Sequence, residues 1–135
     1  MTSVITPAAD TLAGRQIRLL VVEDEIFIRM FVCDLLRDAG YDVVEAVSGD
    51  EALDILKAGI PIDLVLSDVR MPGATDGLAL LEFVRRNLAD LPVILTSGHL
   101  SPDIALAHGA AHFLSKPFKI DDALSAVALE ASKLK

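Results

Sequence analysis

The chain has a single cysteine, no tryptophan and few basic residues, and each shortage excludes a class of protein. Cys33 cannot form an internal disulfide, so we expect a reducing, cytoplasmic setting and a thiol buried as a small core residue. Twelve basic against 20 acidic side chains give a net charge of −8, which disfavours unaided binding to nucleic acid or an anionic membrane. No apolar run approaches the roughly 20 residues of a membrane span, and the first residues lack the pattern of a signal peptide.

Aromatic side chains make up only 4% of a chain that is 53% hydrophobic, so its core must be aliphatic. A length of 135 residues suits one domain that can bury a substantial core. Residues 1–16 are rich in Thr, Ser, Pro, Ala and Gly and show no periodicity. They predict a flexible N-terminal lead, which leaves 17–135 as the folded domain.

Short apolar stretches typical of strands alternate with helical stretches five times after residue 16. The expected strands lie at 18–22, 41–47, 62–68, 92–95 and 112–114. This alternation predicts an α/β fold with a five-stranded parallel sheet, doubly wound and flavodoxin-like, that carries helices on both faces.

The stretches between these strands show helical periodicity and helix-start signals. The first places six apolar side chains on one face, at Ile28, Phe31, Val32, Leu35, Leu36 and Ala39. The third does the same with Leu78, Leu81, Val84 and Leu88. Ser48 with Glu51 predicts a capping box for the second helix, and Ser101 followed by Pro102 predicts the start of a short fourth one.

Polar side chains follow four of the predicted strands, and in a parallel sheet all these strand ends lie at one edge. They are Glu23, Asp24, Asp68, Thr96, Ser97 and Lys116. Two carboxylates about 5 Å apart repel by roughly 3 kcal/mol at an effective dielectric constant near 20. The site must therefore bind a cation, take up a proton or rely on Lys116. Taken alone, the acids after the first strand could equally be a solvated turn that favours the start of a helix.

Hard carboxylate oxygens with open positions suit Mg²⁺, whereas no histidine or cysteine cluster indicates zinc. A carboxylate beside Mg²⁺ can attack phosphorus and form an aspartyl phosphate. Asp68 ends an apolar strand and precedes a Met-Pro-Gly turn, so it is the expected nucleophile. The Lys116 ammonium and the Thr96 hydroxyl can bind the phosphoryl oxygens.

Four motifs in combination resemble the receiver domain of bacterial two-component response regulators, over about Ile17 to Leu134. They are Val22–Glu25, Ser67–Gly73, Leu95–Gly98 and Lys116–Phe118. The resemblance implies that Asp68 accepts a phosphoryl group from a phosphohistidine on a sensor histidine kinase or phosphotransfer protein. The chain would then be a phosphoacceptor in a phosphorelay and not an enzyme.

The resemblance also implies roles for the neighbouring residues. Asp24 and Asp68 would bind Mg²⁺ (or Mn²⁺) through their carboxylates, Arg70 through its main-chain carbonyl, and Glu23 through water. Lys116 would pair with Asp68 and later with the phosphoryl oxygens.

A conformational switch is implied as well. The Lys116–Pro117 bond would be cis, an isomer that only proline makes accessible. Thr96 would move toward the phosphoryl group and Phe113 would follow it inward, although Phe113 could equally be a plain core residue. The shift would reshape a face built from the fourth helix, the fifth strand and the fifth helix, where a downstream protein binds. A homodimer is a further possibility.

Three features depart from the usual family pattern. The loop from Asp68 to Gly77 is one residue longer, and the segment from Thr96 to Phe113 is about two residues shorter, which predicts a short fourth helix. Phe113 stands where Tyr is more frequent. Because one helix follows Lys116, the resemblance predicts a stand-alone receiver without a DNA-binding output domain.

Three other functions compete with this interpretation. A pseudo-receiver would bind partners without taking phosphate. An aspartate-nucleophile phosphatase of the haloacid-dehalogenase type needs a second Asp where Arg70 stands. A flavodoxin-like nucleotide or flavin module needs a Gly-rich loop where Glu23, Asp24 and Glu25 stand. Within the receiver interpretation, Gly98 leaves room for water beside Thr96, which predicts fairly quick hydrolysis of the aspartyl phosphate.

Overall fold

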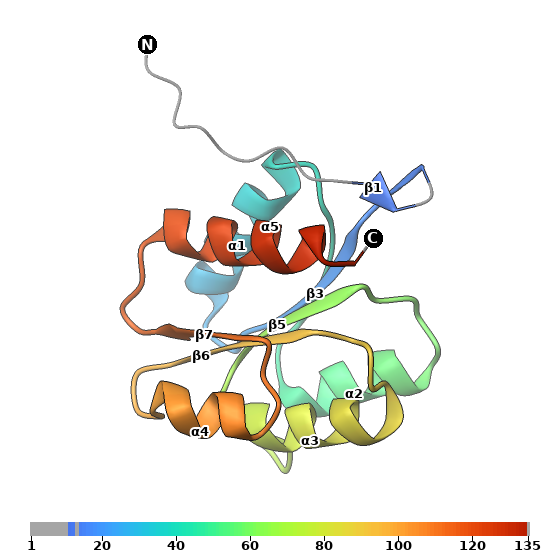
Figure 1. Cartoon of the computed structure of the whole chain (residues 1–135). Helices are drawn as coiled ribbons and strands as arrows, with labels where there is room; N and C mark the ends of the chain where they lie inside the picture. Colours follow the sequence, from blue (N-terminus) through green and yellow to red (C-terminus); the bar gives the residue numbers. More distant parts are fainter. Residues whose placement is uncertain (1–10, 13, 135) are drawn as a thin grey trace.

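The computed structural model describes residues 11–12 and 14–134, and most of them form one parallel sheet with helices on both faces (Figure 1). The sheet has the strand order β4-β3-β5-β6-β7. Its strands are β3 (Arg18–Val22), β4 (Asp42–Ala46), β5 (Leu64–Asp68), β6 (Val93–Ser97) and β7 (His112–Ser115). The order reverses between β3 and β5, and at such a point an open α/β sheet binds its ligands. The predicted doubly wound fold is confirmed.

Five helices connect or follow these strands. They are α1 (Ile26–Asp38), α2 (Gly49–Lys57), α3 (Gly77–Asn87), α4 (Pro102–Ala107) and α5 (Ile120–Ser132). In Figure 1, α1 and α5 cover one face of the sheet, and α2, α3 and α4 cover the other. Successive strand residues point to opposite faces, so Leu19 and Val21 join the core under α1 and α5, while Leu20 and Val22 join the other core.

The predicted helix starts are present. The Ser48 hydroxyl accepts a hydrogen bond from the Glu51 N–H at 3.1 Å, and the Glu51 carboxylate accepts one from the Val47 N–H at 2.9 Å. Ser101 caps α4 and Pro102 is its first residue. With six residues, α4 is as short as its segment of sequence predicted.

The apolar face of α1 was predicted only in part. Val32 and Leu36 are buried as expected, and so is Cys33, whose burial raises the pKa of its thiol to about 12. The prediction was wrong for Ile28 and Phe31, which are 39% and 58% exposed. These two residues lie in the first two turns of the helix, where they line an open groove with the loop after β7.

The inner face of α3 differs from its prediction at two positions. Leu81 and Val84 are buried as expected, and Leu80, which the periodicity did not select, is fully buried as well. Leu88 was predicted inside but is 37% exposed, because the helix ends at Asn87 and Leu88 is its C-cap.

The N-terminal lead contains two short strands where the structure describes it. β1 (Thr11–Leu12) pairs antiparallel with β2 (Arg15–Gln16). The Arg15 guanidinium holds both carboxylate oxygens of Asp63 at 2.7 and 2.9 Å, and this hydrogen bonding lowers the pKa of Asp63. The flexibility expected for residues 1–16 stays a prediction; residues 1–10 and 13 lie outside the described residues. None of the described helices has the length and apolar character needed to span a membrane.

Candidate functional site

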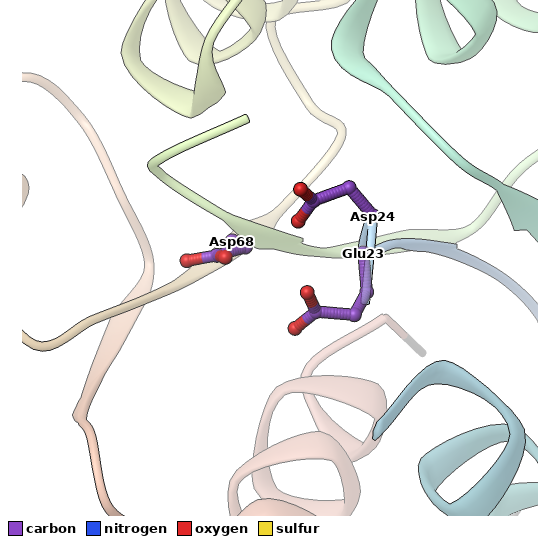
Figure 2. Close-up of side chains that lie close together, drawn as sticks. All are labelled: Glu23, Asp24 and Asp68. Carbon is purple, nitrogen blue, oxygen red and sulfur yellow. The ribbon is translucent and has the colours of Figure 1, made fainter. Parts of the chain in front are cut away.

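Three carboxylates meet where the two central strands end. Asp68 is the last residue of β5, and Glu23 and Asp24 directly follow β3. The pairing of Val22 with Ser67 places these two strand ends side by side. Ligand oxygens of the three acids all lie within 4.8 Å of one another, and Figure 2 shows the side chains gathered at this edge. The sequence prediction of an acidic cluster at one edge is confirmed.

The third acid after β3 has a different task. The Glu25 carboxylate caps α1 by accepting hydrogen bonds from the Ile28 N–H at 2.8 Å and the Phe27 N–H at 3.4 Å. The alternative interpretation of these acids as a helix-start signal therefore holds for Glu25. It does not explain Glu23, whose side chain is only 8% exposed and turns into the cluster.

The pKa of Glu23 is raised at this site. Burial raises the pKa of its carboxyl, and the charge of Asp68 adds to the increase. A hydrogen bond from the Glu25 N–H, at 3.2 Å, and the charge of Lys116 act in the opposite direction but do not cancel it. Burial is thus the main reason that the ionised form of Glu23 is disfavoured at this site.

Lys116 is the cation of the site. Its Nζ lies 3.1 Å from Asp68 Oδ2 and 3.3 Å from Glu23 Oε1, so it contacts an acid from each central strand. Burial on its own lowers the pKa of Lys116, but the hydrogen bond to Asp68 and the charge of Glu23 outweigh it and raise the pKa. The peptide bond from Lys116 to Pro117 is cis, as expected. The contact with Asp68 was expected and the contact with Glu23 was not.

Thr96 and Phe113 lie on the neighbouring strands. Thr96 pairs directly with Asp68 across β5 and β6 and is buried. Phe113 lies on β7 opposite Leu95 and is half-buried against the core under α4. Thr96 therefore lies at the acidic edge and Phe113 on the strand beyond it, and their movement as a switch stays a prediction.

Arg70 lies in the loop that leaves the site after β5. The Val69 N–H donates to the Thr96 carbonyl at 3.0 Å, and the Gly77 N–H donates to the Val69 carbonyl at 2.8 Å. These bonds fix both ends of the loop beside Asp68. The Arg70 side chain is exposed, so only its main chain is held close to the site.

The donor set fits a divalent cation. Within residues 11–12 and 14–134, this is the one cluster of three or more acidic, histidine or cysteine side chains spaced to hold a metal ion. Three carboxylates and one ammonium leave two negative charges when all are ionised. Mg²⁺ binds oxygens at about 2.1 Å, so opposite ligands lie about 4.2 Å apart, which the 4.8 Å spacing allows with water completing the shell.

The sequence did not predict the role of Arg29, which binds the main chain at Glu23. Arg29 is not among the residues that the periodicity places on the inner face of α1, yet only 12% of its side chain is exposed. Its guanidinium donates to the Glu23 carbonyl at 2.8 Å and pairs with Glu45 of β4 at 3.2 Å. No local pattern signals this contact, because Glu45 lies on the next strand.

An apolar surface borders the site on the side of α1. Five exposed side chains form it, namely Ile26, Phe27, Ile28, Met30 and Phe31, and we call it the α1 apolar patch. A groove of about 440 Å³ runs from this patch to Lys116 and Phe118. The groove joins exposed apolar area to the charged site.

Known proteins are similar to this chain in sequence. The family described as response regulator receiver domain matches residues 19–128. The chain is 41% identical to the DNA-binding transcriptional regulator NtrC of Klebsiella pneumoniae over 110 residues, which is 79% of this chain and 23% of NtrC. It is 36% identical to the transcriptional regulatory protein PdtaR of Mycobacterium tuberculosis over 134 residues, which is 96% of this chain and 63% of PdtaR. The chain thus spans less than two thirds of these relatives.

Solved structures agree. The receiver domain of the Francisella response regulator 1452 superposes with a TM-score of 0.83 at 29% identity, over 89% of this chain and all of that one. The receiver domain of the hybrid histidine kinase CckA gives a TM-score of 0.71 at 40% identity, over 84% and 98% of the two chains. With its fold, its acidic edge and these matches, the chain belongs to the response regulator receiver family of two-component signalling.

Proposed function

We propose that Asp68 accepts a phosphoryl group from a phosphohistidine on a sensor histidine kinase or phosphotransfer protein, in a two-component phosphorelay. One observation carries the proposal: the Asp68 carboxylate lies 3.1 Å from the Lys116 ammonium and within the same 4.8 Å cluster as Glu23 and Asp24. A nucleophilic carboxylate, a cation for the phosphoryl oxygens and ligands for a metal ion thus meet at one strand edge.

In the proposed step, an Asp68 oxygen forms a bond to phosphorus while the bond from phosphorus to the donor imidazole breaks. The electron pair of that bond stays on the imidazole nitrogen, which takes up a proton. The Lys116 ammonium exchanges its contact with the Asp68 carboxylate for one with the phosphoryl oxygens, and the Thr96 hydroxyl donates a hydrogen bond to one of these oxygens.

Mg²⁺ or Mn²⁺ would be held by the carboxylates of Asp24 and Asp68 and the main-chain carbonyl of Arg70, with Glu23 acting through water. When bound, the ion offsets the negative charge on the phosphoryl group during transfer. The protein's own contribution is to keep these oxygens together against their mutual repulsion, for which it uses Lys116.

The same geometry makes the chain an acceptor and not an enzyme in this proposal, because one carboxylate takes one phosphoryl group. Loss of that group needs water beside it. Gly98 and Arg70 each follow a site residue by two positions, and Gly98 has no side chain to exclude water. We therefore expect fairly quick hydrolysis, and a half-life of many hours would contradict this.

We assign two surfaces to partners. The α1 apolar patch and its groove suit the phosphodonor protein, since the groove reaches Lys116, whose ammonium contacts Asp68. The face of α4, β7 and α5 suits a downstream protein or a second copy, because Thr96 and Phe113 connect it to the site and Ile104 and Leu129 are exposed there. We expect phosphoryl exchange with these partners to take place in the cytoplasm.

The intact mass of the chain after exposure to acetyl phosphate tests the acceptor role. We expect a gain of one phosphoryl group that requires both Mg²⁺ and Asp68, so Asp68→Asn should show none. Folded protein that gains nothing from acetyl phosphate or from a phosphorylated kinase would identify a pseudo-receiver. Sustained hydrolysis of phosphate monoesters would instead indicate a phosphatase.

A further inference from the structure

The loop between β5 and α3, residues 69–76, turns around a carboxylate of α2. The Asp50 Oδ2 accepts a hydrogen bond from the Ala74 N–H at 3.2 Å. The Thr75 side chain and main chain also hydrogen-bond to Asp50, and these bonds lower the pKa of its carboxyl. Asp50 thus binds the middle of a loop whose two ends are fixed beside Asp68.

Two glycines show how closely the loop and α2 fit together. Gly73 has a φ of +99°, which favours glycine, and a Cβ there would lie 2.5 Å from Asp50 Oδ2. A Cβ at Gly49 would collide with the carbonyl oxygen of Thr75. Thr75 is itself buried. The start of α2 and the turn at 73–75 therefore form one contact that leaves no room for side chains.

This contact acts on the part of the loop next to the acidic site. Val69 is held by the Thr96 carbonyl, and Asp50 holds the chain again at Ala74. Arg70 lies between these two fixed points. Asp50 does not belong to the metal-binding cluster, so its influence on that cluster must pass through the main chain of the loop.

We propose that Asp50 is a positioning residue, which holds residues 73–75 and thereby sets the main chain at Arg70 for binding of a divalent cation. The inference rests on the proposed role of the Arg70 carbonyl. It explains why this loop can be one residue longer than the family pattern: the added turn is fixed by a carboxylate from a neighbouring helix. Groups that orient metal ligands typically change metal affinity by about 10- to 100-fold when they are removed.

The test compares Asp50→Ala and Asp50→Asn with the parent chain, using Mn²⁺ titration followed by electron paramagnetic resonance. We expect Asp50→Ala to weaken Mn²⁺ binding about tenfold, and Asp50→Asn to weaken it less because the amide oxygen still accepts hydrogen bonds. Phosphorylation by acetyl phosphate should return to the parent rate at saturating Mg²⁺. Asp54→Asn removes one charge from the same helix without contacting the loop, and it should leave Mn²⁺ affinity unchanged.

Hydrogen exchange of the Ala74 amide gives a second measurement that needs no metal. Exchange should become faster in Asp50→Ala, while amides of β5 keep their protection. Thr75→Val removes the hydroxyl from the other side of the contact. The double variant should lose less Mn²⁺ affinity than the sum of the losses in the two single variants, because both substitutions break the same contact.

Unchanged Mn²⁺ affinity and unchanged Ala74 exchange in Asp50→Ala would overturn the positioning role and leave the acceptor role of Asp68 intact. A parent chain that binds Mn²⁺ but accepts no phosphoryl group from acetyl phosphate or a kinase would overturn the acceptor role alone. In that case the tenfold loss in Asp50→Ala would still support the positioning role. A parent chain that binds no divalent cation would overturn both.

Discussion

The two helices that follow the acidic strand ends, α1 and α3, differ in how far their apolar side chains are buried. α3 turns Leu80, Leu81 and Val84 completely inward, and the loop before it is tied to Asp50. α1 starts directly after Glu23 and Asp24 and exposes an apolar patch, with Phe27 76% exposed. The site thus has a flank closed by contacts within the chain and a flank open to another molecule.

The buried flank at α3 therefore contributes mainly to stability, and the exposed flank at α1 is suited to recognition. The exposed α1 apolar patch beside the acidic site contributes little to folding, since its side chains remain in water. It supplies the kind of aromatic contact that dominates protein interfaces. The closed flank instead fixes the chain around Asp68, where small displacements of ligand groups are costly.

The largest effect should come from the closed flank. Leu80→Ala removes a fully buried side chain and should lower the free energy of unfolding by about 2–5 kcal/mol. Phe27→Ala on the open flank should change it by no more than about 0.5 kcal/mol. Urea unfolding followed by circular dichroism measures both. Equal losses in the two variants would show that the α1 apolar patch packs against the fold in solution.

Lys116 contacts an acid from each flank. Its removal should have the next largest effect, on the rate of phosphorylation. Lys116→Ala deletes the cation that would bind the phosphoryl oxygens, so phosphorylation by acetyl phosphate should slow by about 10²- to 10³-fold. Intact mass against time gives the rate. Lys119→Ala, three residues further along and exposed, is the matched control. A slowing common to both variants would assign the effect to net charge.

Substitutions on the open flank should slow phosphotransfer from a protein donor but not from acetyl phosphate. Phe27→Ala should slow phosphotransfer from a phosphorylated kinase or phosphotransfer protein by about 10- to 30-fold, corresponding to roughly 1.4–2 kcal/mol of lost contact. Its rate with acetyl phosphate should match the parent. Ile60→Ala, which alters an exposed apolar residue just after α2, should affect neither donor. A slower reaction of Phe27→Ala with acetyl phosphate would place Phe27 in the site itself.

The smallest effect concerns pH. Because the pKa of Glu23 is raised in the folded metal-free chain, the unfolded chain loses this proton first as pH rises. The free energy of unfolding should therefore fall as pH rises from about 4, the ordinary Glu value, through the raised pKa. Glu23→Gln removes this fall, so its stability relative to the parent should grow over that interval and then level off. Urea unfolding at several pH values checks this, and a relative stability that shrinks with rising pH would contradict it.

Most of the closed interior could be predicted from the sequence, because it follows local patterns. Strand residues such as Leu66 and the capping box of Ser48 with Glu51 lie where those patterns place them. The error at Phe31 has a plain cause. Helical periodicity says which residues share a face of a helix, and it does not say whether that face meets a sheet.

The residues that support the site could not be predicted in this way. Asp50 contacts a loop more than twenty positions later, and Arg29 relies on Glu45 of a neighbouring strand. Neither contact leaves a local signal, because each depends on how two distant segments meet in the fold. Asp68 and Lys116 could be predicted because Asp68 ends one strand and Lys116 directly follows another, and the ends of parallel strands meet at one edge of the sheet.

The contact of Lys116 with Glu23 joins residues 93 positions apart in the chain. Contacts of such long sequence separation form only after large loops have closed, and they slow folding for that reason. A growing chain that has not yet reached residue 116 would present its three carboxylates without their ammonium partner. If Asp68 is the proposed acceptor, the ability to accept phosphate should arise only when synthesis and folding of the domain are nearly complete, which would make phosphorylation a measure of a finished domain.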